Sequence, residues 1–368
     1  MKVVHILNEL KFSGAEIMYA SAAKEFQKLG CELYVVSTAQ DLGEYAVHFR
    51  NAGYQVLHWP YMSKSLMHDL KFAKKSSTFF RDNKIDVVHI HRSTMRLMMS
   101  YAAWKAGCKA LYTFHNVFPT KWYTKPYHIA QRWIAKNIFK CVFQTISDSV
   151  YEHEKNFYYN NTYKVYNWYD NSRFFPASDS EKRELRKQLI IPENALVLIS
   201  IGGCSHIKRH SDIINALPLI IEKYPNVIYL HLGEGDTLET ERMEVEKLGL
   251  KEHVRFEGNQ KDVRKFLVVS DIYLMTSEFE GISLTTIEAM VTKIPAILYD
   301  VPGLRDFNAS QRCAKLIPQD YEKLAKAVIA LNENRLEQDL LIENGKALVD
   351  AEFNMPKNVK KIVELYQL

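Results

Sequence analysis

The chain has 368 residues, of which 47% are hydrophobic and 25% are charged, and its formal net charge is +5. These proportions exclude a disordered chain, a collagen-like fibre and a low-complexity scaffold. The length predicts two domains, and no apolar run in the sequence approaches the roughly 20 residues that a membrane-spanning helix needs.

The N-terminus and the cysteines indicate the compartment. The first ten residues, MKVVHILNEL, lack the apolar length and the small-residue cleavage pattern of a secretory signal. The five cysteines stand alone, without a CxxC pair. This usage is typical of a reduced protein. We therefore expect a cytoplasmic protein in which the cysteines serve as small hydrophobic residues.

The charge is unevenly divided between the two halves of the chain. Residues 1–170 hold 22 basic and 13 acidic side chains, whereas residues 171–368 hold 26 and 30. No acidic residue lies between Val87 and Ile146, where nine basic residues stand. The basic half suits nucleic acid, an anionic membrane surface or a phosphorylated acceptor. Solvated lysines on helix surfaces are the simpler alternative.

Short β-branched and aromatic runs alternate with helical patterns in the first half. A strand over Lys2–Leu7 is followed by a loop through Gly14 and by a helix from Ala15 to about Leu29. Strands and helices of these lengths indicate βαβ units and buried parallel sheets. Further strands are predicted at Glu32–Ser37, Val87–Ile90, Ala110–Phe114 and Cys141–Thr145.

The same alternation restarts after a polar, turn-rich join at Asn167–Ser180. The predicted fold class is therefore α/β, with two Rossmann-like, doubly wound parallel-sheet domains at residues 1–170 and 171–352. An amphipathic helix is predicted within residues 353–368, at Pro356–Leu368. The strands of the second half are Leu196–Ile201, Val227–Leu232, His253–Phe256, Ile272–Met275 and Ala296–Leu298, and its helices are Arg209–Lys223, Leu238–Lys247 and Ser283–Val291.

The first glycine-bearing loop follows a strand and opens a helix. Ser13 and Gly14 stand at this helix start, where unpaired backbone N–H groups attract anions and a small residue lets a phosphate approach. The loop matches neither the GxGxxG fingerprint nor the P-loop. A plain turn is the alternative interpretation.

A stronger anion site is predicted after the strand Ile272–Met275. Ser283 can cap the following helix, and the free N–H groups near Leu284 and Thr285 can hold a phosphate. Glu280 before the helix and Glu288 inside it would then bind hydroxyl groups at different depths of one ligand, because carboxylate oxygens accept strong hydrogen bonds. A surface glutamate and an unrelated helix glutamate are the alternative.

Cations and glycines gather at another helix start in the second half. Lys208, Arg209 and His210 follow a loop that begins with Gly202 and Gly203. Cations at a helix start oppose the helix dipole, so a diphosphate between them favours their presence. The sequence holds no DxD motif, and an acidic pair is what a catalytic Mg²⁺ or Mn²⁺ needs. We therefore expect phosphate held by cations and backbone N–H groups, without a metal or another cofactor.

Three histidines stand at the carboxyl ends of predicted strands. His89 and His91 would point to the same face, but a metal site needs further ligands and the sequence makes none evident. His115 follows the strand Ala110–Phe114, at the edge where open α/β sheets bind ligands. His115 is therefore a candidate site residue.

These residues resemble the glycosyltransferases of family 4, which have the GT-B architecture of two facing Rossmann-like domains. The most specific similarity is EGISLTTIEAMVTKIPAILYDVPG, residues 280–303, which holds the family's E-x7-E pattern. SGAE near the start, the pair His115-Asn116, NWYDNSRF at the join and LGEGD at residues 232–236 also match. The resemblance covers nearly the whole chain.

The resemblance implies transfer of a sugar from a nucleotide-sugar donor, with retention of the anomeric configuration. Residues 1–170 would bind the acceptor, residues 171–352 would bind the donor, and the last helix would pack back on the first domain. Glu280, His115 and Lys208 would be the catalytic residues. The implied donor-binding residues are Ser13, Gly14, Gly202, Gly203, Lys208, Arg209, Gly281, Ile282, Ser283, Leu284, Thr285 and Glu288.

One position departs from the family pattern. The family usually has an arginine directly after the glycine that Gly202 matches, and here Gly203 stands in that place. One phosphate cation is therefore missing, and its loss should slow transfer unless another group compensates. Arg209 and His206 are the candidate replacements.

An aromatic and basic segment in the first half suggests where the acceptor binds. Residues 118–140, FPTKWYTKPYHIAQRWIAKNIFK, mix aromatic residues with five lysines or arginines. Such a segment suits the edge of an anionic bilayer. We therefore predict peripheral contact with the inner face of the cell membrane and a lipid-diphosphate-linked glycan acceptor. Packing into the core is the alternative for its aromatic side chains, which include Trp122, Tyr123, Tyr127, Trp133 and Phe139.

The predicted function is a metal-independent, retaining hexosyltransferase that acts in the assembly of capsule, O-antigen or exopolysaccharide. A UDP-sugar is the first choice of donor by family habit, and no nucleic acid partner is expected. One alternative is a GT-B nucleotide-sugar epimerase, which would form product without an acceptor. The other is a nucleotide- or nucleic-acid-binding protein that uses the basic half, although helix-turn-helix, RRM and zinc signatures are missing from the sequence.

Overall fold

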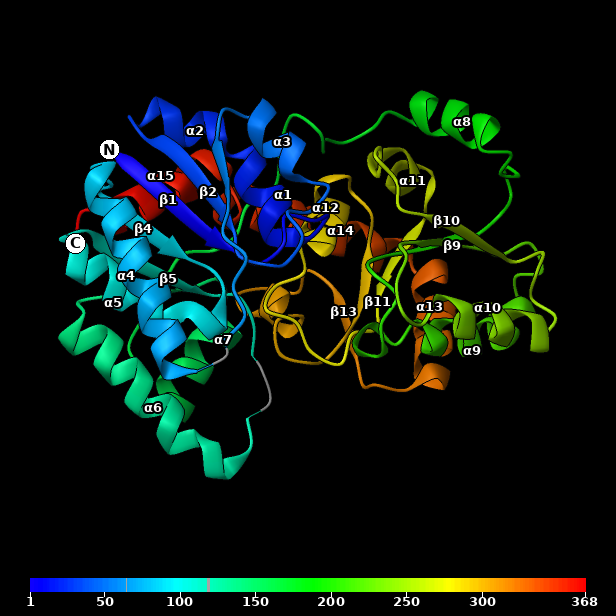
Figure 1. The fold of residues 1–368 in the computed structure, drawn as a ribbon. Coiled ribbons are helices and arrows are strands. Elements are labelled where there is room, and N and C mark those ends of the chain that lie inside the picture. Colours follow the sequence, from blue (N-terminus) through cyan, green and yellow to red (C-terminus); the bar gives the residue numbers. More distant parts are fainter. Residues whose placement is uncertain (64, 118–119) are drawn as a thin grey trace. The chain divides into compact units, whose positions relative to one another are not determined.

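The computed structural model describes residues 1–63, 65–117 and 120–368, which form two compact units (Figure 1). Unit 1 comprises Met1–Asp170 together with Asn354–Leu368, and unit 2 comprises Asn171–Phe353. Each unit is built on a parallel sheet of its own, with seven described strands in unit 1 and six in unit 2. The prediction of an α/β fold with two parallel-sheet domains is confirmed.

The sheet of unit 1 has the strand order β3-β2-β1-β4-β5-β6-β7. Five of the six residues of β1 are buried, as expected for a strand covered by helices on both faces. The order of the strands reverses between β1 and β4, and ligands of such sheets bind at this point, outside the carboxyl ends of the strands. The strands are β1 Lys2–Leu7, β2 Glu32–Ser37, β3 Gln55–His58, β4 Val87–Ile90, β5 Lys109–Phe114, β6 Val142–Thr145 and β7 Tyr163–Lys164.

One helix predicted in unit 1 is two helices in the structure. The pattern from Ala15 to Leu29 forms two helices, α1 and α2, that meet at Ala22. The α-helices are α1 Gly14–Ser21, α2 Ala23–Lys28, α3 Ala46–Asn51, α4 Leu66–Asp82, α5 Arg96–Ala106, α6 Lys125–Trp133, α7 Asp148–Glu152 and α15 Met355–Leu365. The short 3₁₀ segments are η1 Ser93–Met95 and η2 Trp122–Thr124, and the π-helical segments are η3 Ile134–Ile138 and η4 His153–Phe157.

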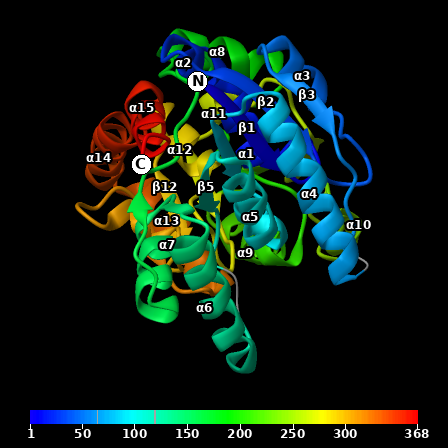
Figure 2. The ribbon, with the colours of Figure 1, turned by 60° about the vertical axis from the view of Figure 1, so that its left-hand side comes forward.

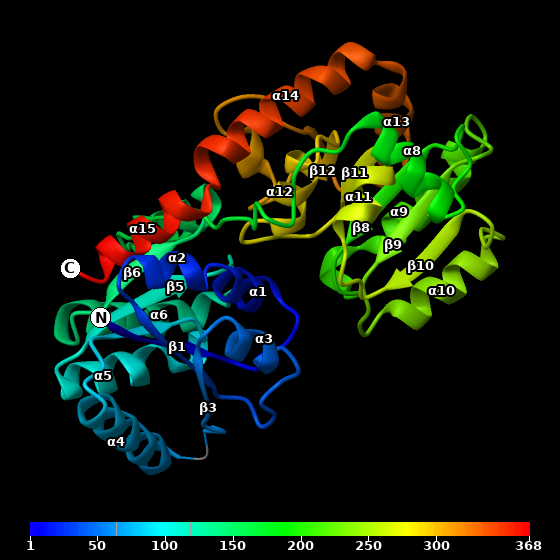
Figure 3. The ribbon, with the colours of Figure 1, turned by 90° about the horizontal axis from the view of Figure 1, so that it is seen from above.

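The last helix of the chain belongs to the unit of the first residues. Helix α15 packs beside α2, as two views of the ribbon show (Figures 2 and 3). The side chain of Asn358 on α15 donates a hydrogen bond of 3.1 Å to the backbone oxygen of Asn167. The Tyr366 hydroxyl lies 2.7 Å from Nδ1 of His89 on β4. The terminal helix therefore completes the core of unit 1 and contributes a polar partner to the sheet.

The sheet of unit 2 repeats this plan with the order β10-β9-β8-β11-β12-β13. Its switch point lies between β8 and β11. The strands are β8 Val197–Ile201, β9 Ile228–Leu232, β10 Val254–Gly258, β11 Ile272–Met275, β12 Ala296–Tyr299 and β13 Lys315–Ile317. The helices are α8 Asp179–Gln188, α9 His210–Ile221, α10 Leu238–Lys247, α11 Arg264–Val269, α12 Leu284–Val291, α13 Tyr321–Glu333 and α14 Arg335–Glu352, with 3₁₀ segments η5 His206–Lys208 and η6 Arg305–Asn308.

Candidate active site

Lys208 lies at the carboxyl end of β8, beside the switch point of unit 2. Its Nζ atom is 2.6 Å from Oε1 of Glu280, which follows β11. A side-chain carbon at Gly202 would come within 3.2 Å of Cε of Lys208, so a glycine at this position leaves room for the lysine chain. The structure therefore brings together three predicted site residues, Gly202, Lys208 and Glu280.

Glu280 is held by contacts from both sides of its loop. The Ser277 hydroxyl donates a hydrogen bond of 2.7 Å to the same carboxylate oxygen that pairs with Lys208. The backbone N–H of Glu280 donates to the oxygen of Pro302 at 3.0 Å. Gly303 has a φ of +80°, and a side-chain carbon there would lie 2.3 Å from the backbone oxygen of Glu280. The carboxylate is thus fixed against a loop that only glycine can approach so closely.

Helix α12 begins beside this pair. Ser283 is its N-cap, and the Ser283 hydroxyl accepts a hydrogen bond of 3.2 Å from the backbone N–H of Thr286. The Thr285 hydroxyl lies 2.7 Å from the Tyr273 hydroxyl and donates to the backbone oxygen of Ile201 at 3.2 Å. These contacts tie the start of α12 to the ends of β8 and β11. The other predicted residues of this segment are Gly281 and Ile282, which are buried, and Leu284 and Glu288, which are half-buried on α12.

The cations that follow Lys208 have different surroundings. Arg209 donates from Nη2 to Oδ2 of Asp212 at 2.8 Å, and the Tyr299 hydroxyl donates to the same oxygen at 2.6 Å. His206 and Gly203 are exposed in the loop. Arg209 is therefore already paired with a carboxylate within its own unit, whereas His206 faces solvent.

Ser13 and Gly14 belong to unit 1, at the start of α1. Gly14 is exposed, and the Ser13 hydroxyl donates a hydrogen bond to the carboxylate of Glu16. Glu16 is buried, and burial raises its pKa. Sequence reasoning missed Glu16, although a glutamate in the first turn of a helix after a serine is a recognisable capping signal.

His115 lies at the carboxyl end of β5 and is the last member of a line of histidines. Its Nε2 atom is 2.9 Å from Nδ1 of His91, and Nε2 of His91 is 3.1 Å from Nδ1 of His5 on β1. Burial lowers the pKa of His115 to about 4 and that of His5 to about 3. These rings are therefore neutral at pH 7, and each can give its neighbour a proton donor or an acceptor.

His89 and His91 share one face, as the alternation along a strand predicts, with ring centroids 4.1 Å apart. The sequence made no further ligand evident, but His5 comes from β1 to lie within reach of both rings. Both ring nitrogens of His89 are already engaged, at 2.7 Å, by the hydroxyl groups of Thr113 and Tyr366. We therefore interpret His5, His91 and His115 as a hydrogen-bonded line and His89 as a neighbouring ring that Thr113 and Tyr366 hold in place.

Two family models match consecutive parts of the chain. The model described as Glycosyltransferase Family 4 matches residues 12–202, and the model described as Glycosyl transferases group 1 matches residues 181–348. The first of these covers more than half of the chain. The chain belongs to Glycosyltransferase Family 4.

Relatives of this glycosyltransferase support that membership. It is 22% identical over 315 residues to the UDP-Gal:alpha-D-GlcNAc-diphosphoundecaprenol alpha-1,3-galactosyltransferase of Escherichia coli, a match that covers 82% of this chain and 80% of that protein. It is 26% identical over 295 residues to the EpsD protein of Bacillus subtilis (strain 168), covering 77% of this chain and 75% of that protein. It is also 21% identical over 193 residues to the TuaC protein of Bacillus subtilis (strain 168), which is named as a glycosyltransferase of teichuronic acid biosynthesis, a match that covers 52% of this chain and 47% of that protein.

Solved structures confirm the GT-B fold. HepE of Anabaena, in a complex with UDP, matches 100% of each chain with a TM-score of 0.85 and 19% sequence identity. A glycosyltransferase of Rickettsia africae ESF-5 matches 100% of this chain and 97% of its own, with a TM-score of 0.84 and 18% identity. At such low identity these likenesses show the fold alone.

Unit 1 of the glycosyltransferase holds a cavity of about 480 Å³ beside His115. Its lining includes Arg96 and Arg132, which are 6% and 7% exposed. Arg132 forms two hydrogen bonds of 2.7 Å with the carboxylate of Glu154, and Nε of Arg96 is buried without a hydrogen-bond partner among the described residues. Sequence reasoning counted both arginines as part of a basic surface. The structure corrects this, because both side chains are buried in the wall of the cavity.

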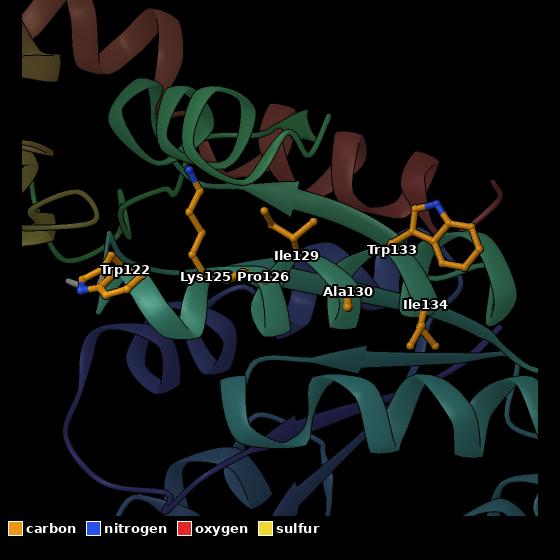
Figure 4. Close-up of a pocket in the computed structure, with 7 residues that line it drawn as sticks. All are labelled: Trp122, Lys125, Pro126, Ile129, Ala130, Trp133 and Ile134. Atoms are coloured by element: carbon orange, nitrogen blue, oxygen red, sulfur yellow. The ribbon is translucent and has the colours of Figure 1, made fainter.

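The segment η2, helix α6 and the segment η3 together carry most of the aromatic segment predicted to bind the acceptor or a membrane. Trp122 is 84% exposed and Trp133 is 59% exposed, and they lie near the two ends of the helix (Figure 4). Tyr123 and Tyr127 are also exposed. The alternative that these side chains pack into the core is therefore wrong for all four. Phe139 is half-buried beside Tyr101 and Trp104, and Phe118 lies outside the described residues.

No helix among residues 1–63, 65–117 and 120–368 combines the length and the hydrophobicity that crossing a bilayer requires.

Proposed function

We propose that this glycosyltransferase moves a sugar from a nucleotide-sugar donor to a lipid-linked glycan, with retention of configuration, in the assembly of a surface polysaccharide. The observation that carries the proposal is the pair formed by Lys208 and Glu280, 2.6 Å apart beside Gly202. The pair places a cation and a carboxylate at the switch point of unit 2, next to the start of α12. A diphosphate needs a cation such as Lys208, and a sugar hydroxyl can donate a hydrogen bond to a carboxylate such as Glu280.

The proposed chemistry assigns one task to each group. Lys208 and the N–H groups at Leu284 and Thr285 bind the diphosphate and stabilise the negative charge that grows as the bond to the anomeric carbon breaks. Glu280 binds the donor sugar, and Glu288 binds the ribose. The acceptor hydroxyl attacks from the face that the diphosphate leaves, and a phosphate oxygen takes its proton. The sequence has no DxD motif, so we propose that these groups act without a catalytic metal.

Gly203 stands where the family usually has an arginine, so another side chain must provide the positive charge that this arginine brings to the phosphate. Arg209 is paired with Asp212 at 2.8 Å, whereas His206 is exposed in the loop. We therefore propose His206 as the side chain that approaches the phosphate, because His206 is exposed whereas Arg209 is half-buried.

A UDP-sugar is the proposed donor. The Escherichia coli relative is named for UDP-Gal, and HepE has been solved with UDP and with UDP-glucose. The same relative is named for a diphosphoundecaprenol-linked acceptor, which supports the proposal of a lipid-linked acceptor here.

The acceptor is proposed to bind unit 1, in the cavity beside His115. The buried guanidinium group of Arg96, whose Nε has no hydrogen-bond partner among the described residues, suits an anionic group of the acceptor, and His115 suits a sugar hydroxyl. The exposed aromatic side chains of α6 and the neighbouring lysines would then lie on an anionic membrane. Contact with the inner face of the cell membrane would bring a lipid-linked acceptor to the enzyme.

The donor is tested by thermal shift and hydrolysis with UDP-, GDP- and ADP-sugars. At a hundredfold excess over Kd, a ligand that binds only the native state stabilises it by about 2.7 kcal/mol. We expect this with one nucleotide for the wild type and for the matched control Lys223→Ala, and its loss in Lys208→Ala and Glu288→Ala. If no nucleotide raises the Tm of the wild type, the donor assignment is wrong.

The membrane contact is tested by co-sedimentation with vesicles of phosphatidylglycerol and of phosphatidylcholine. We expect binding to the anionic vesicles alone, weakened in the double variant Trp122→Ala, Trp133→Ala. Leu336→Ala is the matched control, because Leu336 is also 84% exposed but lies on α14 of unit 2. Equal binding by all three proteins would show that α6 is not the contact.

A further inference from the structure

Four buried side chains with metal-binding groups meet in unit 2. Cys204 comes from the loop after β8, His210 from the first turn of α9, His231 from β9 and Glu241 from α10. All four are at most 4% exposed, and one ligand atom of each lies within 4.8 Å of the others. Four elements that are separate in sequence therefore converge on one enclosed point.

Nε2 of His231 has more close polar neighbours than its hydrogen bonds can satisfy. Nε2 of His231 lies 3.0 Å from Nδ1 of His210, 3.0 Å from Oε2 of Glu241 and 3.8 Å from Sγ of Cys204. One ring nitrogen carries either one proton or one lone pair, so it satisfies one of these neighbours. Oε2 of Glu241 is buried and has no hydrogen-bond partner among the described residues. A buried polar atom in this state is costly.

The chemistry of the group fits one kind of ion. Thiolate, imidazole and carboxylate are the ligands of Zn²⁺, and its bond lengths place neighbouring ligand atoms of a tetrahedron about 3.3–3.8 Å apart. The three distances from Nε2 of His231 are 3.0, 3.0 and 3.8 Å, and all four ligand atoms lie within 4.8 Å of one another, so a small adjustment would fit the ion. We propose that Cys204, His210, His231 and Glu241 bind a structural Zn²⁺.

Charge supports the proposal independently of distance. The Cys204 thiol loses its proton to solvent when the ion binds, and its thiolate, the Glu241 carboxylate and two neutral imidazoles then balance the two charges of Zn²⁺. A neutral assembly can be enclosed without the cost of an unpaired charge. Four protein ligands leave no open position for water or substrate, so the site is structural and separate from the proposed transfer chemistry.

The surroundings show what the ion would hold in place. The Thr237 hydroxyl donates a hydrogen bond of 2.7 Å to Oε1 of Glu241, as partners behind a metal ligand commonly do. The backbone N–H of Cys204 donates to the oxygen of Glu234 at 3.0 Å, and Cys204 forms a bridge with Gly235. Lys208 lies in the chain between Cys204 and His210. The ion would therefore tie the loop that carries Lys208 to β9 and α10.

The proposal is tested by metal analysis of the full chain purified without a histidine tag. We expect one zinc per chain in the wild type and in the matched control Cys313→Ser, since Cys313 is a buried free cysteine outside the group. Cys204→Ser and His231→Asn should lose the zinc, and Thr237→Val should bind it about 10–100-fold more weakly. A chelator should lower the Tm of the wild type but not that of Cys204→Ser.

A cobalt experiment keeps the test decisive if a variant fails to fold. After chelation, the wild-type chain is titrated with Co²⁺, and a tetrahedral site with a cysteine ligand gives visible d–d absorption and a near-ultraviolet thiolate charge-transfer band. Zn²⁺ should then remove both. Chelated wild type that takes up neither ion would overturn the proposal and leave the group as a hydrogen-bonded cluster. Equal uptake by Cys204→Ser and the wild type would overturn the location.

Discussion

The two units carry different chemistry at the same edge of the same kind of sheet. At the switch point of unit 2 the side chains are ionic, with Lys208 paired to Glu280 and Arg209 paired to Asp212. At the switch point of unit 1 they are neutral, because burial lowers the pKa values of His5, His91 and His115. An ionic edge suits a diphosphate, and a neutral one suits hydroxyl groups. We therefore propose that the shared fold sets where each ligand binds and that the side chains of each unit select which ligand.

The largest loss of stability is expected at the buried ion pair of unit 1, which Arg132 and Glu154 form. Glu154→Gln leaves Arg132 without its carboxylate, and both side chains are at most 7% exposed. Breaking such a buried pair costs about 3–5 kcal/mol, so we expect a loss of this size in urea unfolding. Glu152→Gln, which changes an exposed carboxylate nearby, is the control. If Glu154→Gln lowers the free energy of unfolding by no more than the control does, the buried pair does not stabilise unit 1.

The ionic edge of unit 2 is tested through turnover. Glu280→Gln keeps an acceptor for the Ser277 hydroxyl but removes the charge that faces Lys208. We expect kcat to fall about 10²–10³-fold, the size of effect seen when one preorganised group at a developing charge is removed. Glu278→Gln is the matched control, since Glu278 is exposed two residues earlier. Unchanged kcat in Glu280→Gln would contradict the role given to the pair.

The neutrality of the histidines in unit 1 predicts a dependence of stability on pH. His5 has its pKa lowered from 6.5 to about 3 by burial, so the native state stays unprotonated while the unfolded chain takes up a proton. Its contribution is fully present above about pH 6.5 and declines by about 1.4 kcal/mol per pH unit below it. Urea unfolding between pH 7.5 and 5 should show a shallower slope for His5→Phe than for the wild type. An equal slope would mean that His5 is charged in the native state, and the exposed His206→Gln serves as the control.

The smallest expected effect separates stability from ligand binding. Ser283→Ala removes the N-cap of α12, and Ser178→Ala removes the N-cap of α8, each of which accepts a backbone hydrogen bond at 3.2 Å. Each substitution should cost about 1 kcal/mol of stability. Only Ser283→Ala should weaken nucleotide binding in a thermal-shift titration. Equal nucleotide affinity in both variants would show that the start of α12 does not bind the donor.

Much of the fold could be predicted because it depends on local patterns. The strands Glu32–Ser37, Val87–Ile90 and Ile272–Met275 and the helix Leu238–Lys247 have the predicted bounds. The edge strands β3, β7 and β13 were missed, since short and half-exposed strands lack the continuous apolar run of a buried one. The roles given to all the predicted site residues, including Glu280, Lys208 and His115, remain predictions.

Only those parts of the candidate site that lie within one loop or at one helix start could be predicted from the sequence. The E-x7-E pattern located Glu280 and Glu288, and glycine spacing located Gly202 and Lys208. Cys204 and His210 lie close together in the chain, but His231 and Glu241 come from β9 and α10, and the spacing of the four residues matches no metal-binding motif, so the sequence did not indicate a shared site. The burial of Arg132 against Glu154 was equally hidden, since a basic residue on an amphipathic pattern is usually exposed.

The sequence by itself determined the alternation of strands and helices, the membership in Glycosyltransferase Family 4 and the two glutamates of the E-x7-E pattern. These follow from side-chain periodicity and from residues close together in the chain. Only the tertiary structure decided that His5 meets His91 and that Tyr366 reaches His89, and that the aromatic side chains of α6 stay exposed. Such contacts depend on the order of the strands in a parallel sheet and on where the last helix packs, and spacing along the chain does not encode either.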